Sequence, residues 1–197
     1  MTARLKLSNN KLVPDEKRQR IVSAALAVFF KYGYQRVSMN EIAEAAGISR
    51  PGLYLYFSSK EEVFRAAILQ FADSLIEEIS KGLPAQKTIG EKVRYAFEVW
   101  IVQRFDVTLN SPEAKEISDS SYEFAQEALD QSYEKLESVL ASILKGHVKS
   151  SGNKKMLSAE KMAHILTSAV RGFKLVAKSA TELRKLIRDL VVIILTA

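Results

Sequence analysis

The stretch SMNEIAEAAGISRPGLYLYFSSK, residues 38–60, decides the fold of this chain. Ser38 and Glu41 have the spacing of a capping box, in which each side chain bonds a backbone N–H that the first helical turn leaves unpaired. A helix is therefore expected to begin directly after Ser38. Gly47 can adopt the left-handed backbone that ends a helix and turns the chain, and Ser49 then offers an N-cap for a second helix. Two short helices joined by a glycine-containing turn form a helix-turn-helix.

The second helix, expected over residues 50–56, has a composition that suits a DNA-facing surface. Pro51 is tolerated because it falls in the first helical turn, and Leu53 anchors the helix to the core. The other positions include arginine, glycine and two tyrosines. Arginine matches guanine in the major groove, glycine allows close approach of the backbone, and tyrosine hydroxyls can bond phosphate. A connector helix with its aromatic residues in the core is the alternative interpretation.

Residues 42–64, IAEAAGISRPGLYLYFSSKEEVF, resemble the DNA-binding signature of the TetR/AcrR family of bacterial transcriptional regulators. That signature has an alanine-rich helix, Gly, an apolar residue, Ser, variable residues, Leu-Tyr-x-aromatic-Phe, and a Lys with acidic residues. The similarity extends over about residues 15–64. The resemblance implies that the bases are faced by Arg50, Pro51, Gly52, Leu55 and Tyr56, and that phosphates are held by Ser38, Tyr54 and Lys60. Ser49, the cap of the recognition helix, completes the candidate DNA-binding residues.

The composition fits a soluble, cytoplasmic protein. With 197 residues and 47% hydrophobic residues, the chain can bury a substantial core in one domain or two small ones. The absence of cysteine excludes disulfides and thiolate catalysis, and it suits a reducing cytoplasm. The N-terminus has no apolar run of signal-peptide length, and the apolar run over residues 190–195 is too short to cross a bilayer.

The net charge of +6 is concentrated in the segment that contains the helix-turn-helix. Residues 1–60 carry ten basic and four acidic side chains, whereas the rest of the chain is neutral. This is where attraction to phosphate requires positive charge, although a basic tail alone is also typical of a solvated surface. Residues 1–13 are expected to be a mobile arm. They are either simply disordered or able to reach the minor groove through Arg4, Lys6 and Lys11.

Capping signals predict helices along the whole chain, and no alternating strand pattern occurs, so the expected fold class is all-α. The first helix is expected to follow Pro14 and to end at Gly33, and it braces the motif. Later helices are expected to start after Ser59, Thr88, Ser120, Ser158 and Ser179, with ends at Gly82 and Gly146 and a polar loop over residues 150–155.

The long helix after Ser59 is expected to leave the DNA-binding unit and enter the rest of the protein without a linker. The predicted domains are therefore residues 1–60, with the N-terminal arm and the helix-turn-helix, and residues 61–197, a helical ligand-binding and dimerisation domain. The apolar residues 190–195 encircle more than one face of the last helix, so a second surface must cover them. The resemblance implies a homodimer through the last two helices, and a buried single-chain core is the alternative.

Aromatic residues are frequent over residues 88–145. The resemblance implies a cavity there that accepts a small-molecule effector and shifts the long helix. Such a pocket needs an apolar wall and a few polar anchors, although aromatic stripes also form ordinary cores. The candidate ligand-binding residues are Trp100, Arg104, Tyr122 and His164. Arg104 could pair with an acidic group of the ligand, or with Asp106 or Glu98 in a surface salt bridge.

The favoured function is a ligand-responsive transcriptional repressor that binds double-stranded DNA and releases a palindromic operator when its effector binds. Its two recognition helices would enter successive major grooves about 34–36 Å apart. An enzyme is disfavoured, because the chain has only two histidines and lacks the common catalytic and metal-binding motifs, and no cofactor is expected. The remaining alternative is an architectural DNA-binding or protein-interaction module without a small-molecule effector.

Overall fold

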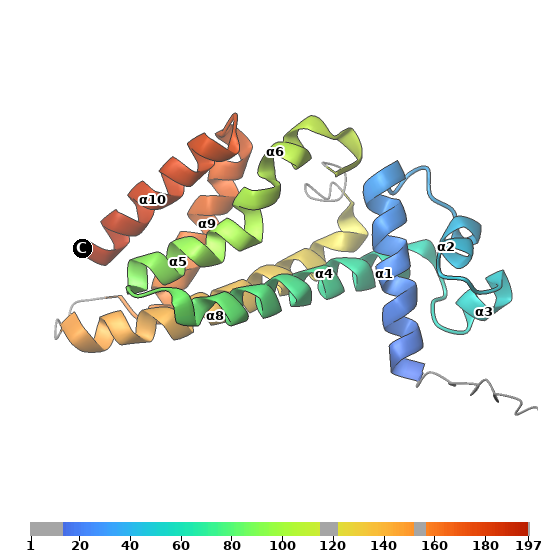
Figure 1. Cartoon of the computed structure of the whole chain (residues 1–197), viewed down its shortest axis with the longest axis horizontal. Coiled ribbons are helices and arrows are strands. Elements are labelled where there is room, and N and C mark those ends of the chain that lie inside the picture. The colour runs from blue at the N-terminus through green and yellow to red at the C-terminus, as the bar shows by residue number, and fades with distance from the viewer. Residues whose placement is uncertain (1–13, 115–121, 152–156, 197) are drawn as a thin grey trace, which may run out of the picture.

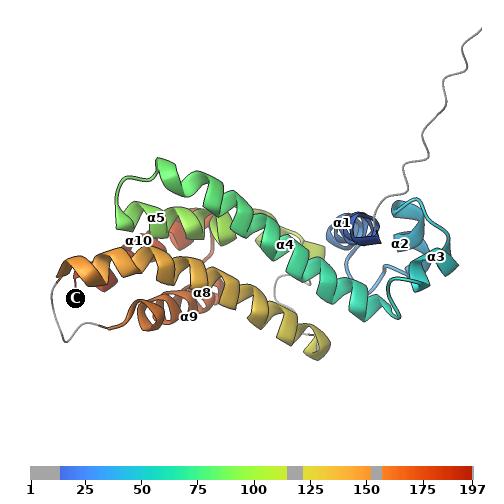
Figure 2. The ribbon, with the colours of Figure 1, turned by 90° about the horizontal axis from the view of Figure 1, so that it is seen from below.

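The computed structural model describes residues 14–114, 122–151 and 157–196. Within these ranges the regular structure is helical and contains no strand, so the predicted fold class is confirmed. A small group, α1 to α3, lies at one end of an elongated molecule, and α4 extends from it into a larger helical group (Figures 1 and 2). None of the helices in these ranges is both long and apolar enough to span a membrane.

The small group consists of α1 (Pro14–Tyr32), α2 (Met39–Ala45) and α3 (Arg50–Tyr54). Gly33 ends α1 with a φ of 79°, as predicted. Completely buried apolar side chains hold the three helices together, among them Phe29 of α1, Ile42 of α2 and Leu53 of α3. The first turns of α4 and of α8 add side chains to the same core. The helix-turn-helix is therefore braced by helices that continue into the rest of the protein.

The long helix α4 (Lys60–Gly82) is unbroken, and Ser59 caps it by accepting a hydrogen bond from the Glu62 N–H at 3.2 Å. The Glu62 carboxylate accepts from the backbone N–H of Ser58 at 2.7 Å, one residue before the cap that a capping box would use. A short 3₁₀ turn, η1 (Leu83–Ala85), follows α4.

The larger group contains α5 (Ile89–Phe97), α6 (Gln103–Asn110), α8 (Glu123–Ser151), α9 (Ala159–Val176) and α10 (Ala180–Thr196). Between α5 and α6 lies η2 (Glu98–Val102), a π-helical turn that the sequence analysis did not predict. The predicted starts at Thr88, Ser158 and Ser179 are confirmed. Ser120 and residues 1–13 lie outside the described residues.

The prediction that a helix ends at Gly146 was wrong, because α8 continues to Ser151. A glycine inside a helix costs only about 1 kcal/mol relative to alanine. The following turn packs Val148 against the C-terminal core, which offsets that cost. The polar loop expected over residues 150–155 accordingly begins later, and residues 152–156 lie outside the described residues.

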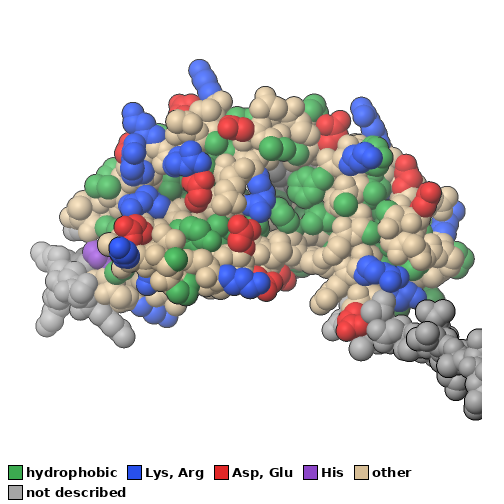
Figure 3. Space-filling view, viewed as in Figure 1, with side chains coloured by type: hydrophobic (Ala, Val, Ile, Leu, Met, Phe, Trp, Pro, Cys, Tyr) green, Lys and Arg blue, Asp and Glu red, His purple; other side chains and the backbone are tan. Residues whose placement is uncertain are grey.

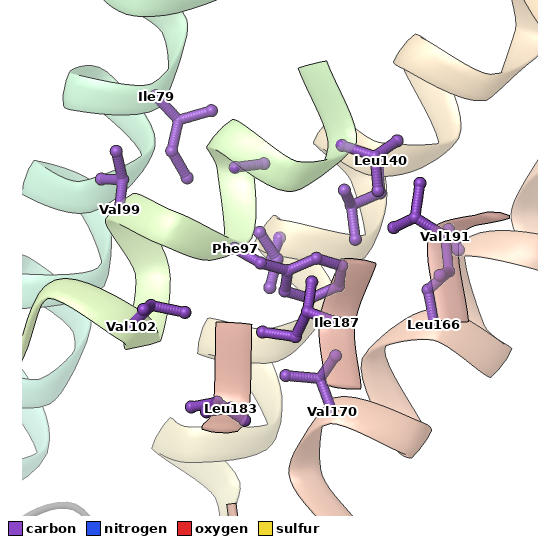
Figure 4. Close-up of a cluster of buried hydrophobic side chains, with 14 of the residues drawn as sticks. Ile79, Phe97, Val99, Val102, Leu140, Leu166, Val170, Leu183, Ile187 and Val191 are labelled. Atoms are coloured by element: carbon purple, nitrogen blue, oxygen red, sulfur yellow. The ribbon is translucent and has the colours of Figure 1, made fainter. Parts of the chain in front are cut away.

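The C-terminal core is formed by α5, η2, α8, α9 and α10, with side chains of α4 and α6, around Phe97, which is completely buried (Figure 4). Ile187 of α10 and Leu140 of α8 contribute side chains to this cluster. Along α10 only one side of the apolar run is covered. Val191 is buried, whereas Val192 and Ile193 are 52% and 63% exposed.

Candidate DNA interface and ligand cavity

The turn between α2 and α3 has the predicted local geometry. The Ser38 N–H donates to the Glu41 carboxylate at 2.7 Å, and the Glu41 N–H donates to the Ser38 hydroxyl at 3.3 Å, which confirms the capping box. The Glu41 carboxylate accepts hydrogen bonds from the Ser38 hydroxyl and from the Ser38 N–H, and these two bonds, the hydroxyl first, lower the pKa of Glu41. Gly47 has a φ of 65°, in the left-handed region that glycine adopts without strain. The local sequence thus fixes the angle between the two helices.

The short helix α3 buries one anchor and exposes the rest of its surface. The Gly52 N–H donates to the Ser49 hydroxyl at 3.1 Å, which caps the helix and leaves the hydroxyl proton available. Pro51 and Arg50 are exposed. The side chains of Tyr54 and Leu55 are 45% and 84% exposed.

Charge and apolar surface lie next to each other on this exposed side of α3. The Arg50 guanidinium lies 5.7 Å from the centre of the Tyr54 ring. An exposed arginine fork and an exposed leucine are groups that can contact guanine and the thymine methyl group in a major groove.

Two cations of α1 lie beside the recognition helix. The Lys17 ammonium is 5.6 Å from the centre of the half-buried Tyr56 ring, and the Arg18 guanidinium is 4.8 Å from the centre of the Phe57 ring. Both cations belong to the positive excess of residues 1–60, but they lie outside the motif from which the DNA-binding residues were predicted. Both residues lie near the start of the first helix, in the segment that carries the charge excess, and this clustering could have indicated that they belong to the DNA-facing surface.

Two predicted phosphate contacts already have partners within the protein. The Ser38 hydroxyl donates its proton to the Glu41 carboxylate at 2.7 Å. The Lys60 ammonium donates to the Tyr34 carbonyl oxygen at 2.9 Å, so two of its three N–H donors remain. The structure therefore gathers Arg50 and its exposed neighbours on one side of α3, and it holds Ser38 and Lys60 in intramolecular hydrogen bonds.

Tyr34 joins the DNA-binding unit to the start of α8. Its hydroxyl donates to the Glu61 carboxylate at 3.0 Å. Burial, followed by this hydrogen bond, raises the pKa of Tyr34 above its ordinary value. The Tyr34 ring also packs against Tyr122 and Phe124, with centroids 4.8 and 5.2 Å apart. A displacement of the start of α8 would therefore also displace Tyr34, which lies in the loop that precedes α2.

A half-open cavity of about 140 Å³ lies between the DNA-binding unit and the C-terminal helices. Hydrophobic side chains gather over the middle of the face shown in Figure 3, between α1 and α6. The apolar lining consists of Leu26, Phe30, Ile68, Phe71, Ala72, Leu75, Trp100, Ile101, Phe105 and Leu129. The polar lining consists of Arg104, Thr108, Ser132, Tyr133 and Lys174.

Of the four predicted ligand residues, the structure brings Trp100 and Arg104 together at the cavity and places the other two elsewhere. Tyr122 precedes α8 and stacks on Phe124 within the N-terminal core, with ring centroids 5.4 Å apart. His164 points outward from α9, where its Nδ1 lies 3.2 Å from the Glu137 carboxylate. These positions depend on how α8 and α9 are packed, which local sequence does not specify.

Arg104 belongs to α6 and contacts both η2 and α4 at the edge of the cavity. Its Nη1 donates to the Val99 carbonyl oxygen of η2 at 2.8 Å, and its Nη2 lies 3.4 Å from the Glu78 carboxylate of α4. Asp106 and Glu98, the partners that the sequence suggested for Arg104, bind other groups. Glu98 binds Arg184 through two hydrogen bonds, and Asp106 accepts from the first N–H of α10.

The contribution of α1 to the cavity was missed by the sequence analysis. Leu26 and Phe30 line the cavity and belong to the helix that braces the helix-turn-helix. They are four residues apart, so they lie on one face of α1. They form a second apolar stripe beside the one that packs on α2 and α3, and in the sequence this stripe could have indicated that α1 has a further contact surface. A molecule in the cavity would touch the DNA-binding unit directly.

Comparisons with known proteins agree with this arrangement. Residues 21–67 match the family model for bacterial regulatory proteins of the tetR family. The chain is 36% identical over 91 residues to the transcriptional activator FasR of Mycolicibacterium smegmatis, covering 46% of this chain and 42% of FasR. It is 30% identical over 104 residues to the regulator TtgW of Pseudomonas putida, covering 53% of this chain and 71% of TtgW.

The fold is similar to that of Bacillus subtilis FadR in complex with stearoyl-CoA, with a TM-score of 0.62 and 18% identity. That match covers 90% of this chain and 97% of FadR. By sequence, the chain matches less than half the length of FasR and of several other curated relatives. The family model, the identity shared with TtgW and the common fold together show that the chain belongs to the TetR family, whose members are transcriptional regulators and not enzymes.

Proposed function

We propose that this chain is a ligand-responsive transcriptional repressor that binds double-stranded DNA as a homodimer and releases a palindromic operator when a small molecule enters the cavity. One observation carries the proposal. The cavity is lined both by α1 of the DNA-binding unit and by the C-terminal helices. A ligand that binds better to one relative position of these two parts shifts the equilibrium between them.

The proposed domains are residues 1–60 for DNA binding and residues 61–197 for effector binding and dimerisation, with α4 as the lever between them. The proposed base contacts are Arg50, Pro51, Gly52, Leu55 and Tyr56. Ser38, Ser49, Tyr54 and Lys60 position the recognition helix or contact phosphates. We place the protein in the cytoplasm, where its DNA target lies.

The proposed dimer interface is the outer surface of α9 and α10. Large apolar side chains on these helices are exposed, namely Ile165, Leu175, Val176, Val192 and Ile193. A second copy of the chain would cover them in a four-helix bundle. It would also place two α3 helices in successive major grooves, about 34–36 Å apart.

The apolar wall with a few polar groups is typical of small-molecule sites, and the bound stearoyl-CoA in B. subtilis FadR supports a small-molecule effector. FasR is named an activator, so the sign of regulation needs its own measurement. Transcription from a promoter with and without its operator gives that sign directly, and repression is expected here.

The decisive experiment is selection of bound DNA from a random pool at near-physiological salt, followed by sequencing of the recovered sites. A palindrome with half-sites about one helical turn apart is expected. Recovery without a preferred sequence would instead favour an architectural DNA-binding module. The selected operator then serves to screen small molecules for those that release it.

A further inference from the structure

The ionised side chains that line the cavity carry positive charge only. Arg104 of α6 and Lys174 of α9 belong to the lining, and no aspartate or glutamate is found among the described residues that form it. The rest of the wall is mainly apolar. An anionic group of an effector would gain charge-assisted hydrogen bonds from such cations, whereas an uncharged effector would gain only weaker ones.

Two of the three hydroxyl groups of the lining, those of Ser132 and Thr108, donate to the helices that carry them. The Ser132 hydroxyl donates to the Ala128 carbonyl oxygen at 2.7 Å, and the Thr108 hydroxyl donates to the Arg104 carbonyl oxygen at 2.9 Å. Neither proton is directed at the cavity, so the cations are the stronger anchors for an oxygen acceptor of a ligand.

Arg104 is held at the cavity by a pair of contacts of different strength. The hydrogen bond to the Val99 carbonyl oxygen is short, at 2.8 Å, and fixes the guanidinium on η2. The contact with Glu78 is longer, at 3.4 Å, and both side chains of this pair are about two-fifths exposed. Water screens such a pair, so the ion pair is weak and its carboxylate can be exchanged for another anion.

We propose that the cavity binds a small apolar molecule with a single anionic group, and that this anion replaces the Glu78 carboxylate beside Arg104. The inference rests on the proposed function and specifies its effector class. The apolar part would lie against Trp100 and Phe71 of the wall. A cavity of about 140 Å³ is close to the size that accommodates one aromatic ring, so a larger molecule extends through the open side.

This exchange also supplies the link to DNA binding. Glu78 belongs to α4, so its replacement removes an ion pair that ties α4 to α6. The same ligand would touch Phe30 of α1. The effector thus acts on the lever helix and on the DNA-binding unit from one position.

The test uses two fluorescent probes that differ in charge. The anionic probe is 8-anilinonaphthalene-1-sulfonate, and N-phenyl-1-naphthylamine is its analogue without the sulfonate. Trp100 is the only tryptophan of the chain and lines the cavity. Energy transfer from Trp100 to the probe therefore reports a probe bound near this cavity, and the variants of Arg104 and Glu78 separate this site from other apolar surface. The purified full-length protein is titrated with each probe in the absence of DNA.

Three variants separate the roles of the charges. Arg104→Met is expected to weaken binding of the sulfonate probe about tenfold and to change binding of the neutral probe less than twofold. Glu78→Gln removes the competing carboxylate, so it should tighten binding of the sulfonate probe at least twofold. Arg184→Met, which breaks an arginine–carboxylate pair away from this cavity, is the matched control and should leave both affinities unchanged.

Parallel weakening of both probes by Arg104→Met, or weaker sulfonate binding in Glu78→Gln, would overturn the proposal. Absence of energy transfer from Trp100 to the bound sulfonate probe would overturn it as well. None of these titrations contains DNA. A failed operator selection therefore refutes the proposed function without changing the charge preference of the cavity, and the reverse also holds.

Discussion

Arg50 and Lys60 are expected to contribute differently to DNA binding, because their surroundings differ. Arg50 is exposed at the start of α3, where its fork can read a base edge, whereas Lys60 is already bonded to the Tyr34 carbonyl oxygen. Arg50→Ala should weaken binding to the selected operator by about 1–3 kcal/mol, with a smaller effect on random DNA. Lys60→Ala should weaken binding to all DNA alike and lower the salt slope by about one. Equal losses on operator and random duplexes in both variants, measured by titration at several salt concentrations, would contradict this division.

Replacement by alanine is expected to change the free energy of unfolding in opposite directions at Gly47 and at Gly146. Gly47 has positive φ and open space where a Cβ would lie, so Gly47→Ala adds backbone strain alone and should lower the free energy of unfolding by about 1 kcal/mol. Gly146 lies inside α8, and a Cβ there would meet Ile89 at an ordinary 3.6 Å. Gly146→Ala should therefore raise the free energy of unfolding by about 0.5–1 kcal/mol. Urea denaturation of both variants tests the pair, and stabilisation by Gly47→Ala would refute the assigned turn.

At the scale of helices, the caps make stability depend on pH. Backbone N–H groups at helix starts lower the pKa of Glu62 and of Glu91, and the Ser38 hydroxyl does so first for Glu41. Each folded-state pKa thus lies below the ordinary value of 4.5. The caps contribute stability above pH 4.5, and this contribution is lost as the pH falls through the folded-state values.

The thermal midpoint should therefore fall on acidification below about pH 4.5. Glu91→Gln lacks one of these carboxylates, so its midpoint should be lower at pH 7 and should depend less on pH over the acidic range. Glu77 pairs with Lys81 on the surface of α4 and does not bond the start of a helix, so Glu77→Gln is a control for loss of a surface ion pair without loss of an N-terminal cap. An identical acid profile for Glu91→Gln and the native chain would count against the cap.

The helix starts could be predicted from the sequence because caps are local, as Ser38, Thr88 and Ser158 illustrate. The π turn η2 could not, because its geometry depends on contacts from outside the segment. The Arg104 side chain bonds the Val99 carbonyl oxygen, and Val99 packs into the core formed with distant helices. The same limit applies to the cavity. Its lining includes Trp100 and Arg104 of the four predicted ligand residues, whereas the outward direction of His164 depends on the packing of α9.

For the whole molecule, the exposed apolar surface of α10 predicts a dimer. Val192→Glu combined with Ile193→Glu would place two charges where the partner helix is expected, and both side chains are exposed in the single chain. The double variant should therefore fold with little loss of helix content and sediment as a monomer. Val107→Glu, which changes a side chain of α6 that is 67% exposed, is the matched control and should remain dimeric.

Loss of the dimer should also change DNA binding in a specific way. A monomer presents one α3 and contacts one half-site, so its affinity for the full palindrome should fall to its affinity for an isolated half-site. The native dimer should bind the palindrome far more tightly than a half-site, because the second contact occurs at high effective concentration. Sedimentation velocity and titration with both duplexes test this together. A double variant that still sediments as a dimer, or a monomer that retains full affinity for the palindrome, would show that the last two helices do not set the spacing of the recognition helices.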